Sequence, residues 1–252
     1  MPIDVDPTSP SLPWCIIAAM HSELSAVKHL KLPHLQYLET GIGPSNAEKA
    51  IVSYLGKHTT SCAVHIGYAG ALSHALSVGD VVVADAITGA EDCPVDPKLQ
   101  CVVEALSPSG VRVCRGKVVT LDRILGTAAE KQEAARTYAA GLPACVDMES
   151  APVAKACAAQ GVPYVALRCI TDTLDDDLPI DFNECRGRDG NIHTMRIMWA
   201  AAHHPSSIAG LLEMRRRARD CARNLAEVVR CLHAAYRGCS GHPAGGSAGQ
   251  SA

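Results

Sequence analysis

Apolar and polar positions follow two spacings along the chain, and these predict strands and helices in turn. Short, almost continuous apolar runs, such as WCIIAA at residues 14–19 and VPYVALRCIT at residues 162–171, are typical of strands buried on both sheet faces. Between such runs, apolar residues recur at helical spacing. The pattern predicts strands at residues 14–19, 35–38, 62–66, 78–84, 111–120, 144–148 and 162–171, and helices around residues 24–30, 47–55, 128–139, 149–159 and 206–235.

Strands that alternate with helices indicate an α/β protein with a layered sheet. Neither a linker nor a repeat interrupts the pattern, so residues 13–237 are predicted to form one domain. Residues 1–12 and 238–252 lack periodicity and are rich in Pro, Gly and Ser, which predicts disordered ends. Two glycine-rich segments, TGIG at residues 40–43 and GYAGALS at residues 67–73, are predicted to be turns.

Composition narrows the range of partners. The formal charge of -3 gives no field that would hold a polyanion, and aromatic residues at 4% leave little to stack on bases, so nucleic-acid binding is not expected. A secretion signal and a run of 18 apolar residues are both missing, so no membrane span is expected. The twelve cysteines are dispersed among small apolar residues and form no CxxC pair, which is typical of reduced thiols in a cytoplasmic protein.

Two carboxylates follow predicted strands and are candidates for chemistry. If residues 144–148 and 162–171 form neighbouring parallel strands joined by a right-handed crossover, Glu149 and Asp172 lie at the same carboxyl edge of the sheet. A carboxylate at a helix start suits the vicinal diol of a ribose, and an aspartate among apolar residues can donate a proton. The alternative is structural: Glu149 would complement a helix dipole and Asp172 would cap the next segment.

The segment TGIGPSNA resembles a dinucleotide-binding loop only in part. Asn46 stands where the third glycine belongs, and no matching acid follows about twenty residues later. The glycines are better explained by a close approach of backbone to a sugar or an anion, or by a plain tight turn. The histidines form neither HExxH nor a pair with cysteine at zinc spacing, so neither a metal nor another cofactor is expected.

Five blocks together resemble the nucleoside phosphorylase superfamily, and within it the methylthioadenosine/S-adenosylhomocysteine nucleosidases. The blocks are AAMHSEL from Ala18, TGIGPSNA from Thr40, IGYAGALS with VGDVVVAD, VDMES from Val146, and LRCITD from Leu167. The resemblance implies a single three-layer αβα domain with a mixed, barrel-like central sheet. It also implies a homodimer that cleaves the N-ribosidic bond of a purine nucleoside without a cofactor.

The resemblance assigns roles to individual residues. Glu149 would grip the ribose hydroxyls and Met148 would pack beneath the sugar, while Asp172 would protonate the purine leaving group and Glu23 would position the attacking water. Phe182 matches an apolar residue of the segment that closes over the ligand, with packing on the core as the alternative. Such a division fits an oxocarbenium-like transition state, which needs an acid on the base and a held water at the sugar.

The chain departs from the nucleosidase pattern at two positions. Tyr68 replaces a serine at the glycine turn that also contains Gly70, and Ile124 occupies the position expected to supply an aromatic ring to the adenine. The resemblance still assigns substrate-binding roles to Gly70, Tyr68 and Ile124.

The sequence also indicates which nucleophile attacks the sugar. Phosphorylases place an arginine just before the glycine turn, where this chain has His65, and the carboxylate of Glu23 would repel phosphate. Water is therefore the expected nucleophile. Two alternatives stay open: phosphorolysis of an adenosine attached to a polycyclic lipid, as in the hopanoid-associated phosphorylases, and a non-catalytic nucleoside sensor.

Overall fold

The computed structural model describes residues 12–89, 108–139, 143–185 and 207–239, with isolated positions between 92 and 106 and at 187. The strands are β1 Trp14–Ala18, β2 Leu35–Glu39, β3 Cys62–Ala71, β4 Val81–Thr88, β5 Asp92–Cys93, β6 Val113–Thr120, β7 Ala144–Asp147 and β8 Tyr164–Asp172. The helices are α1 His21–His29, α2 Pro44–Leu55, α4 Ala128–Tyr138, α5 Ser150–Ala159 and α7 Ser207–Cys239. Of the predicted terminal segments 1–12 and 238–252, residues 1–11 and 240–252 lie outside the described residues, whereas α7 continues through residues 238 and 239.

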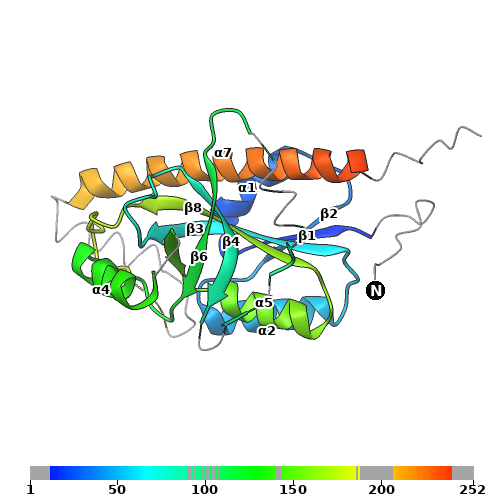
Figure 1. Cartoon of the computed structure of the whole chain (residues 1–252), viewed down its shortest axis with the longest axis horizontal. Coiled ribbons are helices and arrows are strands. Elements are labelled where there is room, and N and C mark those ends of the chain that lie inside the picture. Colours follow the sequence, from blue (N-terminus) through cyan, green and yellow to red (C-terminus); the bar gives the residue numbers. More distant parts are fainter. Residues whose placement is uncertain are drawn as a thin grey trace, which may run out of the picture.

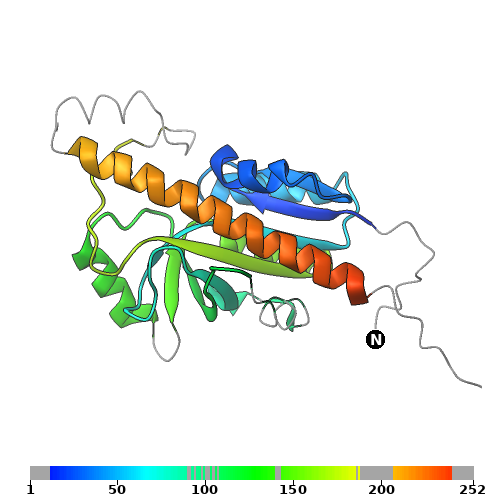
Figure 2. The ribbon, with the colours of Figure 1, turned by 90° about the horizontal axis from the view of Figure 1, so that it is seen from above.

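The elements form three layers, with the sheet between two layers of helices (Figure 1). Helices α1 and α7 cover one face, α2 and α5 cover the other, and α4 lies beside one end of the sheet. Viewed from above, α7 crosses the whole sheet diagonally beside α1 (Figure 2). The ring of Trp14, at the start of β1, packs edge-on against His233 near the end of α7, with 5.5 Å between the ring centroids.

Side chains alternate across each buried strand, which explains why the strand segments are apolar throughout. On β1, Trp14 and Ile16 face the layer of α1 and α7, whereas Cys15 and Ile17 face the layer of α2 and α5. All nine residues of β8 are buried. Both faces of the sheet are therefore withdrawn from water, as expected of strands between two helical layers.

Five strands close on themselves into a barrel. Strand β8 pairs parallel with β3 and antiparallel with β4, β6 runs parallel to both β4 and β7, and β7 pairs antiparallel with the end of β3. Strands β1 and β2 continue the sheet outward from β3 in parallel. The α/β class, the three layers and the mixed, barrel-like sheet that the motifs implied are all confirmed.

The segment GYAGALS was predicted to be a turn, and this is wrong for its first half. Strand β3 continues through Gly67 and Gly70 to Ala71, with an irregularity in its pairing with β8 between Ala69 and Gly70. That bulge bends the strand, so that its body pairs with β8 and its end pairs with β7. The glycines allow neighbouring side chains to approach the strand closely, which local sequence preference alone does not reveal.

The predicted parallel crossover from residues 144–148 to 162–171 is also wrong. The two strands are not neighbours: both pair with β3, β8 in the parallel and β7 in the antiparallel sense. Barrel closure imposes this arrangement, because a bent β3 reaches both strands. Glu149 and Asp172 nevertheless lie on the wall of the same cavity.

Strand β4 begins later and ends later than the predicted 78–84. Gly79 has a positive φ of 93°, and the carboxylate of Asp80 accepts a hydrogen bond from the backbone N–H of Ser77 at 2.8 Å. This turn keeps residues 78–80 out of the strand, which then runs to Thr88. Among the described helices, none is both long and apolar enough to cross a membrane.

Candidate active site

A cavity of about 830 Å³ lies between the ends of β1, β3, β7 and β8 and the beginning of α1. Its wall includes all eight residues that the sequence singled out: Glu23, Tyr68, Gly70, Ile124, Met148, Glu149, Phe182 and Asp172. These residues come from five separate segments of the chain. The fold therefore brings the candidates together, while the role of each stays a prediction.

Glu23 is held at the junction of α1 and β3. Its Oε2 accepts a hydrogen bond from the backbone N–H of Met20 at 2.8 Å, and its Oε1 accepts one from the N–H of Tyr68 at 2.9 Å. Burial raises the pKa of this carboxyl, and the backbone donors oppose the shift. The side chain is thus fixed in place, and its raised pKa makes the ionised form a better proton acceptor than an ordinary glutamate.

The glycine loop before α2 holds the second carboxylate. Gly41 and Gly43 both have positive φ, at 79° and 95°, and the N–H of Gly43 donates to Oε1 of Glu149 at 2.6 Å. The anion that this backbone approaches is therefore a side chain of the protein itself. Burial and the neighbouring Asp147 carboxylate raise the pKa of Glu149, and the hydrogen bond from Gly43 lowers it.

A fully buried arginine on β8 lies close enough to both carboxylates for its charge to lower the pKa of each. The guanidinium of Arg168 donates to Asp147 Oδ2 at 2.7 Å, to Ser150 Oγ at 2.8 Å and to the carbonyl oxygen of His65 at 3.1 Å. Asp147 also accepts from Thr120 Oγ1 at 2.8 Å. Buried ion pairs need such a complete set of hydrogen bonds to offset desolvation.

His65 belongs to the same network. Burial and the nearby Arg168 hold the pKa of His65 well below its usual value, so its ring is neutral. The position before the glycine segment therefore carries no charge for phosphate. Arg168 is nearby, but Asp147, Ser150 and backbone carbonyls occupy its guanidinium. Sequence reasoning missed Arg168.

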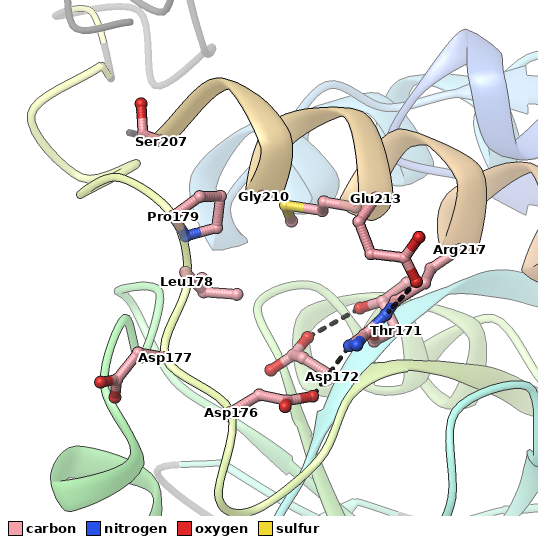
Figure 3. Close-up of a pocket in the computed structure, with 11 residues that line it drawn as sticks. Thr171, Asp172, Asp176, Asp177, Leu178, Pro179, Ser207, Gly210, Glu213 and Arg217 are labelled. Atoms are coloured by element: carbon pink, nitrogen blue, oxygen red, sulfur yellow. Dashed lines mark hydrogen bonds and ion pairs between the residues drawn. The ribbon is translucent and has the colours of Figure 1, made fainter. Parts of the chain in front are cut away.

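Asp172 lies at the end of β8, where the main cavity meets a second one of about 480 Å³ (Figure 3). The second cavity lies between the loop after β8 and the first turns of α7. Arg217 of α7 donates to Asp176, in the loop after β8, at 2.8 Å and to Glu213, one turn earlier on α7, at 3.1 Å. The arrangement joins α7 to the loop that follows Asp172.

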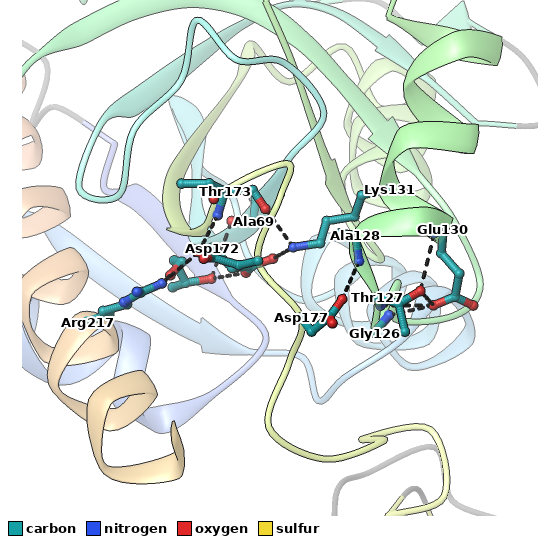
Figure 4. Close-up of polar contacts among 12 residues, drawn as sticks. Ala69, Gly126, Thr127, Ala128, Glu130, Lys131, Asp172, Thr173, Asp177 and Arg217 are labelled. Carbon is teal, nitrogen blue, oxygen red and sulfur yellow. Dashed lines mark hydrogen bonds and ion pairs between the residues drawn. The ribbon is translucent and has the colours of Figure 1, made fainter. Parts of the chain in front are cut away.

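Each oxygen of the Asp172 carboxylate has its own partner (Figure 4). Oδ2 accepts a hydrogen bond from the ammonium of Lys131 at 2.6 Å, and Oδ1 accepts one from Thr171 Oγ1 at 2.8 Å. Lys131 belongs to α4 and its side chain is fully buried. Sequence reasoning did not select this lysine, although it lies three residues before the buried Ala134 and therefore on the inward stripe of a predicted helix.

Gly70 faces Asp172 across the strand pairing of β3 and β8. A Cβ at position 70 would lie 2.9 Å from Asp172 Oδ2 and 3.4 Å from a methyl group of Val146. We expect Gly70→Ala to push the carboxylate away from Lys131 and to lower turnover about tenfold, because crowding of this kind costs about 1–3 kcal/mol. Steady-state assays and thermal unfolding would measure both effects.

Gly56→Ala provides the matched control for that variant. Gly56 ends α2 with a φ of −69°, and its nearest neighbour to an added Cβ lies at 3.4 Å. This variant is expected to keep normal turnover. Wild-type turnover in Gly70→Ala would show that the close approach to Asp172 has no functional weight.

The segment of Ile124 is joined to the segment of Phe182 through Asn183. The Asn183 side chain accepts from the N–H of Ile124 at 2.9 Å and donates to its carbonyl oxygen at 2.9 Å. Of the described residues on the cavity wall, Tyr68 and Phe182 are those with a phenyl or phenol ring. A planar base would thus find these two rings and the aliphatic Ile124, Met148 and Leu178 around it.

Acidic residues predominate on the cavity wall. The described lining residues include five acids, Glu23, Glu39, Asp147, Glu149 and Asp172, against Arg123 as the arginine. Arg123 forms an ion pair with Glu130 outside the cavity. An anionic nucleophile such as phosphate would meet repulsion here, whereas water would not.

Comparisons with known proteins identify the family of the chain. A profile of the phosphorylase superfamily matches residues 34–201. A 5′-methylthioadenosine/S-adenosylhomocysteine nucleosidase of Staphylococcus aureus (strain bovine RF122 / ET3-1) is 23% identical over 205 residues, which cover 66% of this chain and 89% of that protein.

Solved structures share the fold at low sequence identity. The nucleosidase of the same name from Helicobacter pylori, in complex with a substituted pyrrolidin-3-ol, superposes with a TM-score of 0.67 and 15% identity over 88% of this chain and 97% of that one. Futalosine hydrolase of Helicobacter pylori gives the same values. The Neisseria meningitidis nucleosidase with methylthio-immucillin-A has a TM-score of 0.64 and 20% identity over 86% of this chain and 98% of its own. The chain therefore belongs to the phosphorylase superfamily of enzymes, as its motifs predicted.

Proposed function

We propose that the protein hydrolyses the N-glycosidic bond of a purine nucleoside, with a 5′-substituted adenosine as the substrate class. The observation that carries this proposal is the placement of Glu23, Glu149 and Asp172 on the wall of one cavity, each fixed by its own hydrogen bonds. The substrate class is supported by the relatives named as methylthioadenosine/S-adenosylhomocysteine nucleosidases.

Each carboxylate has a task in the proposed reaction. Asp172 gives a proton to a ring nitrogen of the purine, so that the electron pair of the breaking glycosidic bond stays with a neutral base. Glu149 holds the ribose hydroxyls and stabilises the positive charge that develops on the sugar. Glu23 takes a proton from water as the water oxygen bonds to the sugar carbon. Met148 and Phe182 would enclose the substrate.

Water is the proposed nucleophile because the cavity offers no free cation to phosphate among its described residues. Arg168 is occupied by its own network, Arg123 is paired with Glu130, and Glu23 stands where the nucleophile would enter. Repulsion between like charges at close range in a buried site costs far more than at the surface. The same argument disfavours phosphorolysis of an adenosyl lipid, because that reaction also needs phosphate in the cavity.

The test is release of the free base, measured by chromatography. Purified protein is incubated with 5′-methylthioadenosine, S-adenosylhomocysteine or adenosine, in phosphate-free buffer and in buffer with phosphate. We expect adenine at equal rates in both buffers. Strict dependence on phosphate would contradict hydrolysis and favour the phosphorolytic alternative. Tight binding without release from any purine nucleoside would favour a sensor.

The pH dependence of turnover follows from the raised pKa of Glu23. A general base must be ionised, so activity is lost as the pH falls through that pKa. Because burial raises the value above the 4.5 of an ordinary glutamate, the acid limb of kcat/KM should lie above pH 4.5. Rates measured in a series of buffers of constant ionic strength would locate the limb, and a midpoint at or below 4.5 would contradict the assignment.

Loss of fold does not explain this limb. A carboxyl whose folded pKa is raised contributes stability that is fully present below its unfolded pKa and is lost as the pH rises through the folded value. The contributions of Glu23 and Glu149 to stability therefore increase on acidification, opposite to the expected activity. Urea unfolding over the same pH series separates the two effects.

A homodimer, which the resemblance implies, and a cytoplasmic location, which the dispersed cysteines predict, complete the proposal. Light scattering of the purified protein would give the mass in solution, to be compared with the 26.5 kDa of one chain.

A further inference from the structure

Lys131 is buried beside the proposed acid but does not line the cavity. Its ammonium donates to Asp172 Oδ2 at 2.6 Å and to the carbonyl oxygen of Thr173 at 2.7 Å. A lysine with no exposed side-chain surface is unusual, because its charge must be compensated on the spot. The ionised form of Asp172, the residue to which the proposed reaction assigns the proton transfer, supplies that compensation.

The position of Lys131 is fixed by the way α4 begins. Thr127 caps the helix, and Glu130 closes the capping box by accepting from the N–H of Thr127 at 3.1 Å. The same turn is joined to the loop after β8, since Ala128 N–H donates to Asp177 at 2.7 Å and Leu178 N–H donates to the carbonyl of Gly126 at 2.8 Å. Figure 4 shows the bonds of Thr127 with Glu130 and of Ala128 with Asp177, and the lysine reaching from the helix to Asp172.

The partners of Asp172 make its two oxygens unequal. Oδ2 is committed to an ammonium, whereas Oδ1 is bound by the hydroxyl of Thr171, which has a second acceptor in the carbonyl of Ala69 at 3.4 Å. A hydroxyl can rotate between two acceptors, but Lys131 has only hydrogen-bond donors to offer. Oδ1 is therefore the oxygen that can carry a transferable proton.

We propose that Lys131 is a positioning residue for Asp172. Lys131 directs the proton to Oδ1 and stabilises the carboxylate that remains after the proton transfer. The inference rests on the function proposed above. In the step, the proton moves from Oδ1 to a ring nitrogen of the base, and the electron pair of the glycosidic bond stays with the base. The negative charge that Asp172 acquires is shared with the ammonium through a short, charge-assisted hydrogen bond.

A double-mutant cycle tests this inference. Lys131→Met should lower kcat about 10- to 100-fold and leave KM within about threefold, because the lysine touches the acid but not the substrate. Once Asp172 is replaced by Asn, removing Lys131 should cost nothing more, so the Lys131→Met/Asp172→Asn variant should be as fast as Asp172→Asn alone. A purely structural lysine would reduce the rate in both backgrounds.

Restoring the charge provides a second readout. Lys131→Arg should recover part of kcat, and 5′-methylthioadenosine turnover by Lys131→Ala should rise with added methylammonium, which fits the space left by the shortened side chain. Turnover by Asp172→Asn should not respond to methylammonium. Lys155→Met, at an exposed position on α5, is the control for loss of a lysine and should be as active as the unchanged protein.

The possible outcomes separate the inference from the proposed function. Normal kcat in Lys131→Met together with a slow Asp172→Asn would overturn the role of Lys131 and leave the acid in place. Normal kcat in Asp172→Asn would overturn the acid itself. If Lys131→Met does not fold, Lys131→Met/Asp172→Asn and Lys131→Arg still test the inference. The double variant removes both buried charges, and Lys131→Arg keeps both. Additive losses in the cycle would also overturn the inference.

Discussion

Asp172→Asn is expected to lower turnover by about 10²- to 10⁴-fold, the range that a general acid contributes. The amide keeps the shape of the side chain, and its oxygen can still accept the hydrogen bond that Lys131 donates to Oδ2. What it loses is the transferable proton, so the base must depart as an anion. Release of adenine from 5′-methylthioadenosine under single-turnover conditions would measure the loss without interference from product release.

Binding should survive that substitution. Titration calorimetry on Asp172→Asn is expected to give a Kd for the nucleoside close to the KM of the unchanged protein, because Glu149 and the apolar wall are intact. Asp92→Asn, at an exposed position on β5, is the control and should have normal turnover. A slow variant that also fails to bind would assign Asp172 to substrate binding instead of proton transfer.

Strands β1 and β8 could be predicted because each lies between two helical layers. A strand that is buried on both faces must be apolar along its whole length, as β1 and β8 are, and such runs are recognisable without knowledge of their neighbours. Which strands pair was not predictable in the same way. The antiparallel pairing of β7 with β3 depends on the bend at Ala69 and Gly70, and glycine is also the residue expected in a turn.

The acidic part of the site was predictable from motifs, whereas its basic part was not. Glu23, Glu149 and Asp172 stand at the ends of apolar segments, where a carboxylate attracts notice. Lys131 and Arg168 look like ordinary surface cations in the sequence, since lysine and arginine are rarely buried. Their burial depends on partners 41 and 21 residues away along the chain, Asp172 and Asp147, and distances of this kind follow only from the closed barrel.

Two buried cations lie behind the acidic wall of the cavity. Each is paired from behind with a carboxylate, Lys131 with Asp172 and Arg168 with Asp147, while the cavity side of the wall stays negative. The positive charges thereby stabilise the acids without offering themselves to an anionic ligand. This separation is the physical reason for expecting water and a sugar cation in the site instead of phosphate.

Glu23→Gln is expected to reduce hydrolysis by about 10²- to 10⁴-fold, because a neutral amide cannot take the proton of the attacking water. Both oxygens of Glu23 accept backbone N–H groups, so the amide nitrogen would face one of these donors, at a cost to stability of about 1–3 kcal/mol. Glu23→Ala avoids that conflict and should be equally slow, and Glu48→Gln, exposed on α2, is the control.

Assays with and without phosphate give the decisive comparison. If phosphate were the nucleophile, removing the negative charge of Glu23 would relieve repulsion, and turnover in phosphate would be maintained or increased. A loss of equal size in both buffers is the result expected of an enzyme that uses Glu23 to activate water.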